Sequence, residues 1–68
     1  MDNLERLNCL KFELIKLALH KSHDINQWKK MRQNIILTNE LIAEQRAKKD
    51  IDENEIENIE NYIKSRKA

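Results

Sequence analysis

The chain contains neither glycine nor proline among its 68 residues, and this absence restricts its possible folds more than any other feature. Tight β-hairpins rely on glycine, often after asparagine, at positions of positive φ, and the closely spaced turns of a β-sandwich rely on the same chemistry. The interior of an α-helix needs neither glycine nor proline. The sequence therefore predicts an all-α fold.

The first helix is marked at both of its ends. Asp2 and Glu5 have the side chains and the spacing of a capping box, in which side chains satisfy free backbone N–H groups at a helix start. His20 and Lys21 place cationic groups near the negative end of the helix dipole. These signals predict a helix over about residues 3–20.

A second helix is predicted to begin after Asp24, which caps it and whose capping partner Gln27 follows three positions later. Trp28 falls at the fourth helical position, where we expect its side chain to pack back over the turn and inward. Apolar residues recur at helical spacing as far as Ile42, and a basic, polar stretch follows. The pattern predicts a helix over about residues 25–47.

The third helix has the clearest start in the chain. Asp52 and Glu55 form another acidic capping pair, while Ile51 and Ile56 occupy the two positions of a hydrophobic staple. The acidic first half of this segment also suits the positive end of a helix dipole. A helix over about residues 53–66 is predicted.

Short connections restrict how these helices can be arranged. About three residues join the first helix to the second and about four join the second to the third, so sequential neighbours must run antiparallel. We predict an antiparallel helical hairpin plus a third helix, which makes an up-down-up three-helix bundle. A chain of this length has material for one hydrophobic core, so a single domain of residues 1–68 is expected.

Helix one carries more apolar surface than one neighbouring helix can cover. Ten of the sixteen residues from 4 to 19 are apolar, and nine of them spread over roughly 220° at about 100° per residue. A helix packed on one side needs a stripe of little more than about 100°. Two interpretations stay open: helices two and three cover the whole arc, or part of it binds another protein or a second copy of this chain.

The second interpretation predicts a non-enzymatic protein–protein interaction module that acts as an adaptor, a co-chaperone or an inhibitor. A monomer of this size with only three aromatic residues would be marginally stable, which favours association. The apolar faces of helices one and two would form the binding surface, although the same side chains can equally belong to the core. The residues expected to contact the partner are Leu7, Leu10, Phe12, Leu14 and Trp28.

A basic cluster near the start of the second helix supports an alternative function. Lys29, Lys30 and Arg32 would contact phosphates in a small dimeric regulator that binds nucleic acid. The formal net charge of +1 and the acidic third helix both oppose a strong electrostatic attraction to nucleic acid. Nucleic-acid binding is therefore the less favoured function.

No catalytic or metal-binding motif is recognisable, so we expect no enzymatic activity and no cofactor. His20 and His23 straddle a predicted helix end and have no second ligand pair, which argues against a metal site. Cys9 lies at the edge of an apolar face, where a small core residue is expected rather than a nucleophile. A single cysteine and the lack of a long apolar run predict a cytoplasmic protein without a membrane span.

Residues 12–42 resemble the small helical-hairpin co-chaperones that, with a larger chaperone, hold the needle subunit of bacterial type III secretion systems. Those proteins tend to open their second helix with an acid, then a Gln and a Tyr, and residues 24–28 read Asp-Ile-Asn-Gln-Trp. The resemblance implies that the apolar face of the hairpin binds and stabilises a partner. Ser22 and His23 replace small residues common in the family's turn, and the helix from Asp52 onward has no counterpart. The apolar residues of the first helix that carry the resemblance are Phe12, Ile15 and Leu19.

Overall fold

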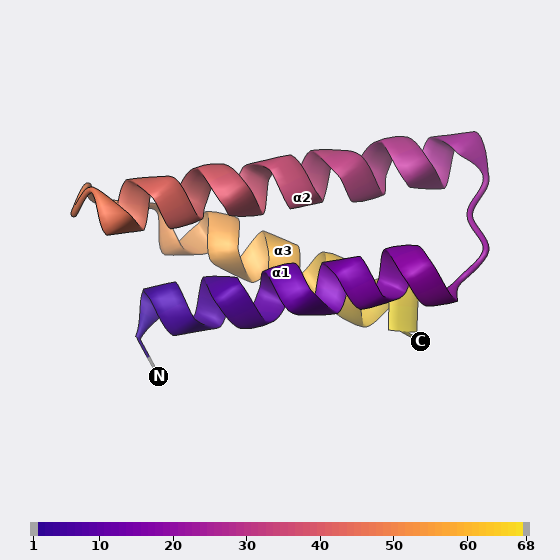
Figure 1. The fold of residues 1–68 in the computed structure, drawn as a ribbon, viewed down its shortest axis with the longest axis horizontal. Helices are drawn as coiled ribbons and strands as arrows, with labels where there is room; N and C mark the ends of the chain where they lie inside the picture. The colour runs from indigo at the N-terminus through magenta and orange to yellow at the C-terminus, as the bar shows by residue number, and fades with distance from the viewer. Residues whose placement is uncertain (1, 68) are drawn as a thin grey trace.

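The computed structural model describes residues 2–67, which form three helices: α1 (Asn3–His20), α2 (Ile25–Arg46) and α3 (Glu53–Lys67). Figure 1 shows α1 and α2 as an antiparallel hairpin, with α3 returning behind them beside α1. Helix α1 makes its most extensive contacts with α2 and also packs against α3. The predicted all-α, up-down-up three-helix bundle is confirmed.

Local capping explains where α1 and α2 begin. The Asp2 carboxylate accepts a hydrogen bond from the Glu5 backbone N–H at 2.8 Å. At the start of α2 the capping box is complete, because Asp24 accepts from the Gln27 N–H at 2.8 Å and the Gln27 side chain accepts from the Asp24 N–H at 2.9 Å. Each aspartate thus lies immediately before its helix, as predicted from the sequence.

The start of α3 also follows its sequence signals, with one difference in detail. The Asp52 carboxylate accepts a hydrogen bond at 2.9 Å from the N–H of Asn54, two positions later. Ile56 is fully buried, and Ile51 is partly buried against the same core. Both predicted staple residues therefore anchor this end of the helix.

The connection between α2 and α3 contains a non-glycine residue in the left-handed region, Lys48, with φ 59°. The Lys48 N–H donates to the Gln45 carbonyl at 3.1 Å, and the Lys49 N–H donates to the Glu44 carbonyl at 3.0 Å. These two bonds form the Schellman arrangement that usually places glycine at this position. The chain makes a glycine-type turn without glycine and accepts local strain at Lys48.

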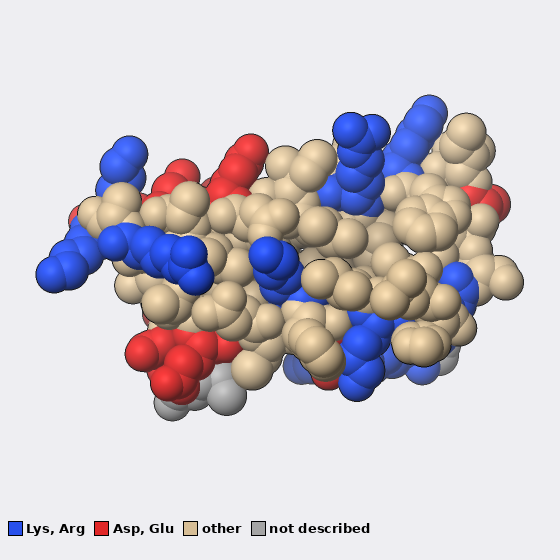
Figure 2. Space-filling model, in the orientation of Figure 1, with Lys and Arg blue, Asp and Glu red and all other residues tan. Residues whose placement is uncertain are grey.

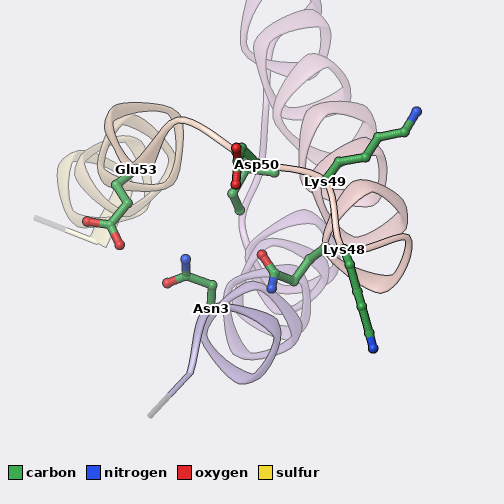
Figure 3. A pocket seen from close by; sticks show the side chains of 7 residues that line it. Asn3, Lys48, Lys49, Asp50 and Glu53 are labelled. Atoms are coloured by element: carbon green, nitrogen blue, oxygen red, sulfur yellow. The ribbon is translucent and has the colours of Figure 1, made fainter.

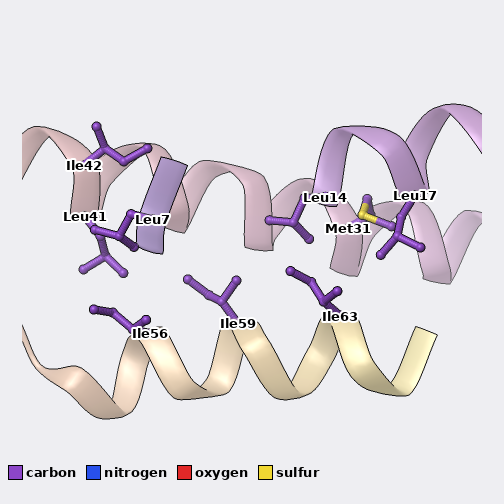
Figure 4. Packing of buried hydrophobic residues seen from close by; sticks show 9 residues of the cluster. All are labelled: Leu7, Leu14, Leu17, Met31, Leu41, Ile42, Ile56, Ile59 and Ile63. Atoms are coloured by element: carbon purple, nitrogen blue, oxygen red, sulfur yellow. The ribbon is translucent and has the colours of Figure 1, made fainter. Parts of the chain in front are cut away.

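The core is a single layer of aliphatic side chains between α3 and the hairpin. Three isoleucines of α3, Ile56, Ile59 and Ile63, point toward leucines of α1 and α2 and toward Met31 (Figure 4). Their spacing of three and four residues keeps them on one side of the helix. The buried hydrophobic residues are Leu7, Leu14, Leu17, Met31, Leu41, Ile42, Ile56, Ile59 and Ile63.

Two ion pairs join α1 to α3. Arg6 Nη2 lies 2.6 Å from Glu60 Oε1, and Lys67 Nζ lies 2.6 Å from Glu13 Oε2. In both helices the paired positions are seven residues apart, about two helical turns, which fits parallel helices in constant register. Such pairs contribute little stability at a protein surface, but they define which side of α1 faces α3.

Candidate interaction surface

One end of the molecule has an open hollow of about 340 Å³ where the N-terminal end of α1 meets the connection between α2 and α3. Figure 3 shows the amino groups of Lys48 and Lys49 directed away from Asn3, Asp50 and Glu53. Across residues 2–67 there is no group of three or more His, Cys, Asp or Glu side chains placed to hold a metal ion. The residues that line the hollow are Asn3, Gln45, Lys48, Lys49, Asp50, Ile51 and Glu53.

A second hollow of about 310 Å³ lies beside the C-terminal half of α1. Glu13 is held there by Lys67, and the hydrogen bond from Lys67, followed by the attraction of its charge, lowers the pKa of the Glu13 carboxyl below its ordinary value. A smaller attraction from Lys16 acts in the same direction and partial desolvation opposes it. The carboxylate is therefore occupied in a structural ion pair.

A surface of exposed apolar side chains is the more informative feature, and we call it the open face. Three of its members come from α1 and three from α2. Phe12, Leu19 and Ile25 have the largest exposed fractions, 65%, 74% and 72%. The remaining three have exposed fractions of 39 to 46%. The open face consists of Phe12, Ile15, Leu19, Ile25, Trp28 and Ile36.

On α1 the open face lies away from α3. Phe12, Ile15 and Leu19 follow one another at steps of three and four, so they form a single stripe. At about 100° per residue this stripe is centred roughly 140° from the buried leucines of the same helix. Arg6 and Glu13, whose side chains reach α3, lie on the opposite flank.

Helix α2 contributes a matching stripe. Ile25, Trp28 and Ile36 are centred roughly 130° around the helix from its buried residues. Because the connection 21–24 is short and the helices are antiparallel, the second half of α1 lies beside the first half of α2. Because both helices are right-handed and they run antiparallel, the two stripes lie on the same side of the hairpin, opposite α3.

Figure 2 shows this side of the molecule. Uncharged side chains cover most of the right half of the view, over and between α1 and α2, while Lys and Arg side chains stand at the edges and near the centre. Asp and Glu side chains gather mostly toward the left end. The exposed apolar side chains of the open face thus lie in a largely uncharged area bordered by basic side chains.

The carboxylates near the open face are already engaged. Between residues 8 and 36 the sequence contains two acids, Glu13 and Asp24. Glu13 pairs with Lys67, and Asp24 caps α2. The exposed cations of the same stretch, Lys29 and Arg32 among them, outnumber these two acids, and Lys16 shares Glu13 with Lys67 at 4.0 Å.

His23 connects the edge of this surface to α3. Its ring meets the Trp28 ring edge-to-face, with centroids 4.8 Å apart and planes 68° apart. Its two nitrogens contact Arg66 Nη2 at 2.8 Å and the Leu17 carbonyl oxygen at 3.0 Å. These contacts could not be predicted from the sequence, because a single histidine in a connection has no pattern that identifies its neighbours.

The structure separates the five predicted partner-binding residues into two groups. Leu7 and Leu14 are fully buried in the chain's own core, so a partner cannot touch them in this conformation, and Leu10 is partly buried against that core. Phe12 and Trp28 lie on the open face. The alternative nucleic-acid residues Lys29, Lys30 and Arg32 are all exposed.

Two expectations about single residues were wrong. Trp28 was expected to pack inward, but 46% of it is exposed, because its position on α2 lies toward the open face. Cys9 was expected in the core, yet it is exposed. It lies roughly 130° around α1 from the buried leucines, outside the stripe that α2 and α3 cover.

No helix in the described part of the chain combines the length and the apolar character needed to cross a membrane. Comparison of the chain with protein-family models, with curated proteins and with solved structures finds no match. The geometry of the open face is thus the main observation that bears on function.

Proposed function

We propose that the chain is a non-enzymatic protein–protein interaction module that binds its partner through the open face. The observation that carries the proposal is the gathering of six large apolar side chains on one side of the hairpin, away from α3. Scattered exposed apolar residues are normal, but a contiguous group bordered by charges is typical of an interaction site. The resemblance of residues 12–42 to secretion co-chaperones supports the same role.

The open face retains enough exposed apolar surface to contribute substantially to binding. Full burial of one Phe, Leu or Ile side chain is worth about 1.5–3 kcal/mol. Burying the exposed parts of three or four such residues is therefore worth roughly 3–8 kcal/mol before the entropic cost of association. Phe12, Leu19 and Ile25 are the strongest candidates, because most of their surface is still in contact with water.

Site-specific photo-crosslinking in the source cell tests this proposal. A photoreactive phenylalanine analogue would replace Phe12 or Leu19 on the open face, and Asn58 on the exposed side of α3 as the matched control. We expect a crosslinked partner from positions 12 and 19 and none from position 58. Adducts of equal yield from all three positions, or none from positions 12 and 19, would contradict the proposal.

Substitutions then separate binding from folding. For this test the photoreactive residue is placed at position 28, also on the open face. Phe12→Asp and Leu19→Asp should abolish the crosslink from position 28 while leaving the helical content unchanged, because both side chains are mostly exposed. Leu14→Asp should unfold the chain, because it places a charge in the core. Loss of the fold in the Phe12 and Leu19 variants would show that these residues stabilise the bundle instead.

A further inference from the structure

We propose that the segment bound by the open face is an acidic amphipathic helix from another protein, which packs on the hairpin as a fourth helix. This inference rests on the proposed function and specifies the chemistry of the partner. It is argued from the charges around the open face and from the way in which the hairpin already holds α3.

Helix α3 shows what kind of segment the hairpin accepts on its other side. It contributes Ile56, Ile59 and Ile63 to the core and directs Glu60 to Arg6 of α1 at 2.6 Å. Five further acids lie in residues 50–57. Helix α3 thus packs against this hairpin through an apolar stripe at helical spacing and one carboxylate that meets a cation of α1, while its Lys67 pairs with Glu13 in the opposite sense.

The open face repeats both features without a helix to cover it. Arg32 lies four residues from both Trp28 and Ile36, so its guanidinium belongs to the same stripe of α2 as these apolar residues. On α1, Lys16 Nζ lies 5.8 Å from the centroid of the Phe12 ring and 4.0 Å from Glu13 Oε1. Lys29 stands beside this stripe at the edge of α2. Cations thus lie within and along the apolar surface on both helices.

These charges favour an acidic helix over a second copy of this chain. A two-fold dimer through the open face would bring the same cations of both copies together, with no free carboxylate among residues 8–36 to offset them. Like charges brought together at an interface are unfavourable, whereas opposite charges favour binding and select the partner. The acidic helix of a second copy is not free, because α3 is packed into its own core.

Two synthetic peptides of about eighteen residues provide the probes. Both carry leucines at positions i, i+3, i+4 and i+7, and they differ only in their flanking residues, which are glutamates in one peptide and lysines in the other. Neither contains tryptophan, so the fluorescence of Trp28, the single tryptophan of the chain and half-exposed on the open face, reports binding. We expect the glutamate peptide to shift the Trp28 emission to shorter wavelength.

The expected preference is at least about tenfold in Kd for the glutamate peptide at low salt, and it should shrink as salt rises. The double variant Lys16→Glu with Arg32→Glu should reverse the preference. Lys64→Glu, which changes an exposed cation on α3, should leave it unchanged. Phospholipid vesicles rich in phosphatidylserine, a DNA duplex and the chain alone at rising concentration complete the set of probes.

Several results would overturn the inference. Equal affinity for both peptides would contradict the inference that the partner is an acidic helix. The absence of binding by either peptide, while position 12 still crosslinks a partner in the cell, would contradict it too. Both results would leave the proposed function intact. If neither peptide binds and no crosslink forms, both the proposed function and the acidic-helix partner are contradicted. Tighter binding of vesicles or DNA, or a Trp28 shift caused by self-association alone, would assign the open face to a different ligand.

Discussion

His23 accepts a hydrogen bond from Arg66, whose Nη2 lies 2.8 Å from the ring nitrogen Nδ1. The other ring nitrogen, Nε2, lies 3.0 Å from the carbonyl oxygen of Leu17, which can only accept. Because the guanidinium can only donate and the carbonyl can only accept, these two contacts fit the tautomer with its hydrogen on Nε2. One imidazole in the connection between α1 and α2 thus ties the last turn of α3 to the hairpin.

Replacing His23 by alanine should lower the free energy of unfolding by about 1–2 kcal/mol, because it removes two hydrogen bonds and leaves their partly buried partners without protein contacts. His20→Ala is the matched control, since His20 is exposed at the end of α1, and we expect a change within about 0.5 kcal/mol. Denaturant unfolding measures both. Equal effects of the two substitutions would show that the contacts of His23 do not stabilise the bundle.

The ion pair between Glu13 and Lys67 predicts a pH dependence. The pair lowers the pKa of the Glu13 carboxyl in the folded chain, so its contribution is present above the pKa of the unfolded state and is lost as the pH falls through the folded pKa. We expect Glu13→Gln to be less stable than the parent chain near neutral pH. The two should converge well below about pH 4.3, the ordinary range of a glutamate.

Thermal unfolding between neutral and strongly acidic pH tests this behaviour, and low salt keeps the effect measurable because the pair is partly exposed. Lys11 of the same helix has no part in the pair and supplies the control variant Lys11→Gln. The difference in stability between this variant and the parent should not follow the titration of Glu13. A constant offset between the parent and Glu13→Gln across the whole range would contradict the assignment.

Lys48→Gly should stabilise the chain by about 1 kcal/mol. A non-glycine residue in the left-handed region costs about 1–2 kcal/mol, which exceeds the roughly 0.4–1 kcal/mol lost through the greater freedom of glycine in the unfolded state. Lys49→Gly, one position later, adds only the greater conformational freedom of glycine in the unfolded state, so it should be neutral or destabilising. A lower melting temperature for Lys48→Gly than for the parent chain would mean that the left-handed turn carries no strain.

Asp52→Ala should cost about 1 kcal/mol, because its carboxylate accepts a hydrogen bond from the free N–H of Asn54 at 2.9 Å. Asp50→Ala is the matched control, since Asp50 is exposed in the connection before the cap. Hydrogen exchange would show faster opening of α3 in the Asp52 variant. Unchanged exchange throughout residues 53–67 would show that packing alone maintains the helix.

The helix starts could be predicted from the sequence because their signals are local. Asp24 and Gln27 are three residues apart, and their two hydrogen bonds depend on the geometry of one turn. The same holds for Ile51 and Ile56, which both anchor the start of α3 in the core. The direction of the helices followed from the shortness of the connections between them.

The division of α1 between core and open face could not be predicted in this way. A helical wheel shows the width of the apolar arc but not which part of it α3 covers, and contacts such as Arg6 with Glu60 join positions 54 residues apart. Leu14 and Phe12 are equally apolar in the sequence, yet Leu14 is buried and Phe12 faces solvent. Ile25 and Ile36 were missed as surface residues for the same reason, and Ile15 and Leu19 were indicated only by the resemblance to the secretion co-chaperones.

The most direct test of the account is to map, by amide chemical-shift changes, where the glutamate peptide binds on the isotope-labelled chain. The account predicts that the largest changes fall in residues 12–19 and 25–36, and that the amides of Ile56, Ile59 and Ile63 stay close to their free positions. Largest changes within α3, or release of α3 from the hairpin by the peptide, would contradict the claim that the open face is the binding surface.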